Sequence, residues 1–453
     1  MPIEAIHRIT YWFDHAFRGL SVDVPPAEVR DLARLVCQCL DGNTRTYHTS
    51  FHVLSLCDGM QPIQVLAALF HDVVFVQLDG GFPIWVSDLL KGVTRAESES
   101  LRLQEVAPDD HDLALCADIF GFRPNDVLAP NAGMNEFLSS VVAVRLLRRH
   151  LSSAQLIAVA ACIELTIPFR APDAQGNTPA QALAQRVQAR CASLFDAEPQ
   201  RAAFIKTTLT EAVIFANRDV MGFIDASPEH CLSNSMLLVE ESMMPQAASS
   251  ASSLLSYRRA LLGMDTFLSQ LKPAYVGQSF AGCPNARTVV QMQTTTQKNI
   301  TFVRDYLAAV LSSVAIIEAL SRITGSDYPR TLLLSDMRCA EADFFPVPKA
   351  GLIDSDALLQ LLKSGLVPDE NPGLNALPLT ACVYRFMGPK ATRQTYEQAK
   401  QLFDGTLSAQ AFLQQLNRDM VGAIIRLAAE LDAPQKEAIL ALEHSLYANH
   451  HSI

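Results

Sequence analysis

The sequence has no excess of basic residues. Its 453 residues include 36 Lys and Arg against 47 Asp and Glu, which gives a formal net charge of -11. Nucleic acids and anionic membranes attract basic surfaces, so this balance argues against a general binder of either. The sequence also has no uncharged apolar run of about 18 residues, the length that spans a bilayer. The nearest candidate, Tyr306 to Leu320, contains Glu318 and is expected to be a buried helix rather than a membrane span.

Paired cysteine motifs are also missing. Of the ten cysteines, only Cys37 and Cys39 lie close together, and no C-x-x-C pair occurs. This pattern argues against a zinc ribbon or a disulfide framework and is typical of buried thiols in a reducing compartment. Residues 1–17 include acids and histidines but no long apolar core, so they are not expected to be a secretory signal. We therefore expect a cytoplasmic protein.

The sequence lacks the long alternation of apolar and polar residues that is typical of half-buried strands. Hydrophobic residues make up 49% and charged residues 18%, so the chain can bury a large core. Helical periodicity between Pro and Gly breaks predicts an all-α fold, with residues 85–120 and 199–221 among its helices. The small polar run 246–253 is a candidate linker. We expect one domain over residues 1–240 and a helical C-terminal region of unknown role over 245–453.

What the sequence does contain is a dense group of histidines between residues 47 and 72. His48 and His52 are four residues apart, so on a helix they would lie on one face. His71 and Asp72 follow the apolar run 65–70, which predicts a buried helix ending in an imidazole and a carboxylate. Such polar groups need partners, and a divalent cation would serve all of them. The alternative is that these histidines are ordinary core residues of a helical scaffold.

These motifs resemble those of the HD superfamily of metal-dependent phosphohydrolases. YHTSFH (47–52) is similar to the YHNxxH motif of a bacterial branch of that superfamily and to the opening motif of the cyclic-nucleotide phosphodiesterases. ALFHDVVF (68–75) is similar to the AxxFHDxxY segment of the bacterial branch. GMNEFLSSVVA (133–143) resembles its NExxSA segment, and ACIELTIPFR (161–170) resembles the phosphodiesterase segment with the last metal aspartate. The resemblance covers roughly residues 1–240 and implies an HD-domain-like helical bundle.

The resemblance also implies a set of metal ligands. His52, His71 and Asp72 would bind a first divalent metal ion, and Asp72 would bridge to a second. Glu164 stands where the family usually has its last metal aspartate, and Asp118 competes with it for this role. The ion could be Mn, Mg, Zn, Fe or Ni, because sites of histidine and carboxylate accept several metals.

Further residues are candidates for roles in catalysis and substrate binding. In the family pattern, His48 would be the general acid toward the leaving-group oxygen, and metal-activated water would be the nucleophile. Asn135, Glu136 and Arg170 are candidates for binding the substrate, since the forked donors of an arginine suit a phosphate. Each of the three could equally be structural. The polar run 217–219 (Asn-Arg-Asp) could brace the site, contact a phosphate or belong to a structural network.

Three functions are consistent with these residues. The first is metal-dependent hydrolysis of a phosphoester, either nucleotide-like or another small phosphate ester. The second is a catalytically degenerate HD-fold module that binds a nucleotide, a metal or a partner without turnover, and the third is a helical scaffold. Val73, Val74 and Phe75 follow the His-Asp pair where the phosphodiesterases have further acid and histidine residues, which keeps the second function open. We expect a small phosphorylated substrate and no nucleic-acid or membrane partner.

Overall fold

The computed structural model describes residues 3–42, 44–97, 100–244, 254–325, 356–366, 374–431 and 436–447, and the candidate linker 246–253 lies outside them. Contacts divide the chain into two compact units. The first unit consists of Met1–Ala226 and Leu271–Gln297, and the second consists of Ser227–Gln270 and Lys298–Ile453. The first continuous segment of the first unit therefore ends at Ala226, ahead of the boundary expected near residue 240. A second segment of the same unit follows later in the chain.

The described chain is mostly helical, as the sequence predicts. The helices that lie entirely in the first unit are α1 (Ile3–Gly19), α2 (Pro26–Leu40), α3 (Ser50–Cys57), α4 (Pro62–Phe70), α5 (Val76–Asp79), α6 (His111–Phe120), α7 (Met134–Leu147), α8 (Ser153–Leu165), α9 (Pro179–Cys191), α10 (Glu198–Asp219) and α11 (Met221–Ile224), with short 3-10 turns at Ser87–Leu90, Pro130–Ala132 and Pro273–Tyr275.

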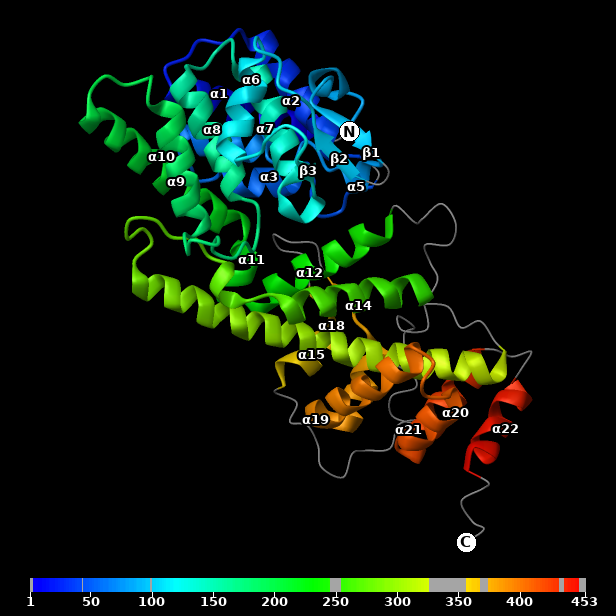
Figure 1. Cartoon of the computed structure of the whole chain (residues 1–453). Coiled ribbons are helices and arrows are strands. Elements are labelled where there is room, and N and C mark those ends of the chain that lie inside the picture. The colour runs from blue at the N-terminus through cyan, green and yellow to red at the C-terminus, as the bar shows by residue number, and fades with distance from the viewer. Residues whose placement is uncertain are drawn as a thin grey trace. The chain divides into compact units, whose positions relative to one another are not determined.

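Helix α8 is the central helix of the first unit. Every residue from Leu156 to Leu165 is buried, and the helix packs against α4, α6, α7, α9 and α10 (Figure 1). Its sequence is apolar around its whole circumference, which is typical of a helix enclosed by others. Ser152 and Gln155 form a capping box at its start, so the first amide groups of this buried helix are satisfied.

Helix α4 is the second enclosed helix, and it carries the His-Asp pair at its C-terminal end. All residues from Ile63 to Phe70 are buried. The helix packs against α1, α3, α7, α8 and α10. Pro62 occupies the first turn, where a missing amide hydrogen costs nothing. The predicted apolar helix ending in an imidazole and a carboxylate is confirmed.

The helix expected over residues 85–120 is wrong for its central part. Strand β1 (Thr94–Glu97) pairs antiparallel with β2 (Ser100–Leu103), and β2 pairs with the short strand β3 (Val127–Leu128). Leu103 and Leu128 are fully buried, so the small sheet covers an edge of the core. The alternation in β2 is only a few residues long, and its partner β3 is distant in sequence, so the local pattern could not predict the pairing.

The second unit is also helical. Its helices are α12 (Pro228–Met243), α14 (Leu254–Gln270), the later part of α15 (Ala286–Thr324), α18 (Ala357–Ser364), α19 (Pro378–Phe403), α20 (Ala409–Gln415), α21 (Arg418–Leu431) and α22 (Lys436–Tyr447) (Figure 1). Helix α15 is long and apolar enough to cross a membrane by length and composition alone, but 78% of its most apolar window is buried inside the protein. Burial of this kind also occurs in core helices, so this observation is weak evidence for a membrane span.

Candidate metal centre

His71 and Asp72 extend from the C-terminal end of α4 into the interior of the first unit. His71 is the C-cap residue and keeps helical backbone angles, and both side chains are largely buried. The Nδ1 atom of His71 lies 2.9 Å from the carbonyl oxygen of Ala68. A proton on Nδ1 would be donated to that carbonyl, so Nε2 is the ring nitrogen that a cation would bind in place of a proton.

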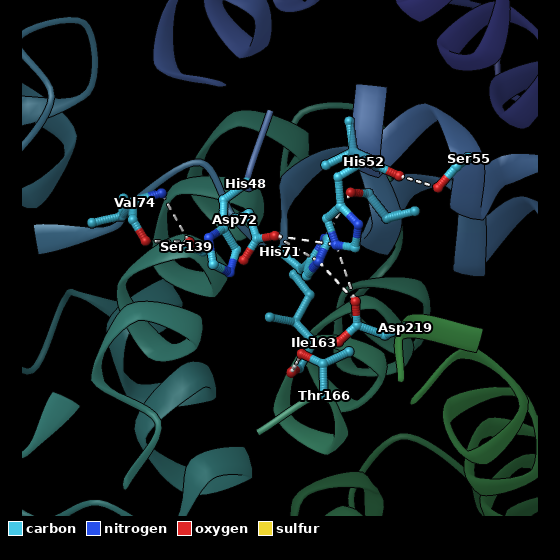
Figure 2. Close-up of polar contacts among 12 residues, drawn as sticks. His48, His52, Ser55, His71, Asp72, Val74, Ser139, Ile163, Thr166 and Asp219 are labelled. Carbon is cyan, nitrogen blue, oxygen red and sulfur yellow. Dashed lines mark hydrogen bonds and ion pairs between the residues drawn. The ribbon is translucent and has the colours of Figure 1, made fainter. Parts of the chain in front are cut away.

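His52 and Asp219 complete the cluster from two other helices. His52 lies in the first half of α3, and Asp219 is the last residue of α10. The Nε2 atom of His52 lies 3.2 Å from Oδ1 of Asp219 and 3.6 Å from Oδ2 of Asp72. The Nε2 atom of His71 lies 2.9 Å from the same Asp72 oxygen and 3.5 Å from the Asp219 oxygen. Figure 2 shows the four side chains pointing toward one another.

The ligand atoms of His52, His71 and Asp72 all lie within 4.8 Å of one another, close enough for three atoms to share one ion. Nitrogen and carboxylate ligands lie about 2.0–2.2 Å from a transition metal such as zinc, so in a tetrahedral site neighbouring ligand atoms are about 3.3–3.6 Å apart. The Nε2 atom of His71 and Oδ2 of Asp72 are buried, and within the described part of the chain they have no hydrogen-bond partner beyond the ion-pair contacts of the cluster. Buried charged groups are costly unless they are paired or bind a cation. His52, His71 and Asp72 could therefore hold a metal ion, with Asp219 beside them.

The electrostatics of the cluster reflect two buried carboxylates beside histidines. Burial opposes the charged imidazole of His71, but the carboxylates of Asp72 and Asp219 outweigh it and hold the pKa of His71 well above its usual value. Burial would raise the pKa of Asp72, but His71 and His48 lower it far below its usual value. His52 and His71 likewise lower the pKa of Asp219 to about 2. Both carboxylates are therefore ionised at neutral pH and available to a cation.

His48 lies beside the cluster, but it is not on the same helix as His52, where the sequence predicts it. It precedes α3, so His48 and His52 are not one turn apart on a helix face. Their ring centroids are 6.2 Å apart, and the ring of His48 packs 4.5 Å from that of Phe75. Figure 2 shows His48 beside Asp72, in agreement with its effect on the pKa of that carboxyl group. His48 is thus near the cluster although it does not share a helix with His52.

Glu164, the expected last ligand, has different partners. Its side chain is fully buried, and its carboxylate accepts hydrogen bonds from Arg170 at 2.6 Å and from Arg186 at 2.5 Å. Asp118, its competitor, is exposed and lies 3.5 Å from Arg190. Both oxygens of Glu164 are bound by Arg170, so the carboxylate is neutralised where it stands. The carboxylate beside His52 and His71 belongs to Asp219 instead.

The three candidate substrate-binding residues fall into different environments. Asn135 accepts a hydrogen bond from the amide of Val76 and donates one to the side chain of Gln77, so it braces the segment after Asp72. Arg170 is committed to Glu164. Glu136 has a buried Oε2 atom without a hydrogen-bond partner among the described residues, and burial followed by the charge of Asp72 raises the pKa of Glu136 to about 7.

Asp219 is the residue whose place in the cluster the sequence reasoning missed. The run 217–219 drew attention as a polar triplet in apolar surroundings, but brace, phosphate contact and structural network were the roles considered. The signal that could have found it is a carboxylate that follows the short apolar run 212–216 at the end of a helix, similar to the position of Asp72 after the run 65–70. Asn217 does have a structural role: its amide exchanges hydrogen bonds with the backbone of Gln278, at 2.9 and 2.7 Å.

Comparisons with protein-family models, with curated proteins and with solved structures give no match for this chain. The geometry of the cluster is therefore the main guide to what the protein does.

Proposed function

We propose that this protein is a metal-dependent phosphohydrolase of HD type, with a first unit folded as an HD-like helical bundle. The observation that carries the proposal is the convergence of two imidazoles and two carboxylates, in which the buried His71 Nε2 and Asp72 Oδ2 atoms lie 2.9 Å apart and have no hydrogen-bond partner outside the cluster among the described residues. Histidine, His-Asp and a later aspartate occur in the order that the family uses. The substrate would be a small phosphoester, and the protein would be cytoplasmic.

The residues around the cluster have the chemistry that hydrolysis requires. A bound divalent cation would supply water activated at neutral pH and positive charge for the phosphoryl oxygens. His52, His71, Asp72 and Asp219 would hold it. His48, beside Asp72, is suited to donate a proton to the leaving-group oxygen, because an imidazole titrates near neutrality.

Metal analysis tests the first half of the proposal. Protein purified without chelator should hold about one equivalent of a divalent metal per chain, and Asp72→Ala should lose it. Asp112→Ala is a matched control, because Asp112 is also a buried aspartate but is paired with Arg148 at 2.9 Å. Wild-type protein that stays metal-free after incubation with Mn, Zn and Fe would refute the metal site and favour a helical scaffold.

Hydrolysis assays test the second half. The metal-loaded protein should hydrolyse at least one member of a panel of phosphomonoesters, linear and cyclic phosphodiesters and nucleoside triphosphates. His48→Ala should retain the metal and lose about 100-fold or more in turnover, the usual contribution of a general acid. Bound metal without hydrolysis of any panel member, with Mn, Mg, Zn, Fe or Ni, would reject the enzyme and leave a binding module.

A further inference from the structure

Arg45 is a buried cation next to the proposed metal centre, just before the segment that carries His48 and His52. Its side chain is fully enclosed. Burying a charged guanidinium costs free energy unless its N–H donors have hydrogen-bond acceptors. The acceptors that Arg45 contacts therefore indicate its role. Its Nη1 atom donates to the backbone carbonyl of Asp72 at 2.6 Å and to that of His48 at 3.4 Å. One donor atom thus links the two backbone segments that carry the proposed metal-binding carboxylate and the proposed general acid.

Asp79 holds the other edge of the same guanidinium. Arg45 donates from Nε to Oδ1 of Asp79 at 3.0 Å and from Nη2 to Oδ2 at 2.7 Å, which is a two-bond fork. The same Oδ2 accepts from the backbone amide of Phe75 at 3.3 Å. Asp79 is the last residue of α5, so the fork ties this short helix and the turn after Asp72 to the guanidinium.

The two residues therefore close a ring of contacts around the Asp72 backbone. Within the part of the chain that the structure describes, these hydrogen bonds join Arg45 and Asp79 to each other and to backbone groups, and not to the side chains of the His52, His71, Asp72 and Asp219 cluster. They hold the backbone of Asp72 and of His48, and this fixes the positions from which the two side chains extend. A lysine would keep the charge, but its compact ammonium group cannot form the fork and reach a carbonyl at the same time.

We propose that Arg45 and Asp79 form a positioning pair that fixes the backbone of Asp72 for metal binding and holds the backbone of His48 beside it. This inference rests on the proposed function, because it concerns the same metal centre. Partners that orient metal ligands through hydrogen bonds are commonly worth about 10–100-fold in metal affinity. We expect loss of the fork to cause a change of that size even in a protein that remains folded.

Cobalt(II) is the probe for the test, because its visible absorption reports the number and geometry of its ligands. Full-length wild-type protein, Arg45→Lys and Asp79→Asn are titrated with Co²⁺ alone, and circular dichroism establishes that each is folded. Arg145→Lys is the matched control. Arg145 is also mostly buried and donates to a carboxylate, Asp110, and to a backbone carbonyl, that of Leu89.

Arg45→Lys should bind Co²⁺ about 10–100-fold more weakly than wild type and show a shifted or weakened absorption band. Asp79→Asn keeps one accepting oxygen, so its Co²⁺ affinity should fall by a smaller factor. If Arg45→Lys does not fold, the comparison of Asp79→Asn with wild type is the test. Arg145→Lys should match wild type in affinity and spectrum. Folded Arg45→Lys and Asp79→Asn with wild-type affinity and spectrum would overturn this inference and leave the proposed function intact. No Co²⁺ binding by wild type would overturn both.

Discussion

The unpartnered carboxylate of Glu136 leads to a prediction about stability and pH. Glu136 lies in the first turn of α7, and burial and the nearby charge of Asp72 raise its pKa from the usual 4.5 to about 7 in the metal-free fold. Because the folded pKa is the higher one, the native state binds more protons than the unfolded chain between pH 4.5 and 7. The contribution of protonated Glu136 to the free energy of unfolding is therefore fully present below about pH 4.5 and is lost as the pH rises through about 7.

The size of the decline follows from the two pKa values. At 1.36 kcal/mol per pKa unit, the difference between 4.5 and about 7 corresponds to about 3 kcal/mol. Glu136→Gln has nearly the same shape and no charge to bury. We expect this variant to be more stable than wild type by up to about 3 kcal/mol at pH 8 and close to wild type at pH 4.5.

Urea unfolding of both proteins with a chelator present, at pH 4.5 and 8, measures the difference directly. Other titrating groups are common to both proteins, so they largely cancel from the comparison. Glu4→Gln, on the exposed face of α1, is the control and should show no such change with pH. A difference between wild type and Glu136→Gln that is the same at both pH values would refute the reasoning. Added metal should reduce the advantage of the variant, since a cation beside Asp72 offsets the buried negative charge.

Three other substitutions test individual contacts. Asp219→Asn should bind metal at least about 10-fold more weakly than wild type in a competition assay, and unchanged affinity would remove Asp219 from the centre. Glu164→Gln should lower the free energy of unfolding, measured in denaturant, by about 3 kcal/mol, because Arg170 and Arg186 lose their counterion. Its metal content should stay at the wild-type level, and loss of the metal would show that Glu164 is a ligand after all. Asn217→Ala should cost about 1–3 kcal/mol in the same assay, because the buried amide of Gln278 loses its acceptor, and an unchanged midpoint would show that this contact is dispensable.

The sequence was sufficient for the part of the site that is local. His71 and Asp72 follow an apolar run, and that run is the enclosed helix α4. The family resemblance groups His52 with this pair, and the Nε2 atoms of both histidines approach the Asp72 carboxylate. Hydrophobic periodicity predicts such elements because each depends mainly on which of its own faces is buried.

The fourth side chain of the cluster could not be predicted in the same way. Whether Asp219 or Glu164 faces the histidines depends on how α8 and α10 pack against α4, which no local pattern records. The pairing of Glu164 with Arg186 depends on the placement of α9 as well. The hairpin at β1 and β2 shows the same limit, because its alternation is short and its third strand comes from a distant segment.

The hydrogen bonds between Asn217 and Gln278 have a consequence for the order in which the protein matures during synthesis. The two residues are 61 positions apart, and the chain between them includes residues of the second unit. At about 5–20 residues per second, a ribosome needs roughly 3–12 s to make that stretch. The end of α10, with Asp219, therefore leaves the ribosome well before the segment that anchors it. During that time the end of α10 lacks its hydrogen bonds to Gln278, so the proposed metal centre should reach its final geometry late in translation.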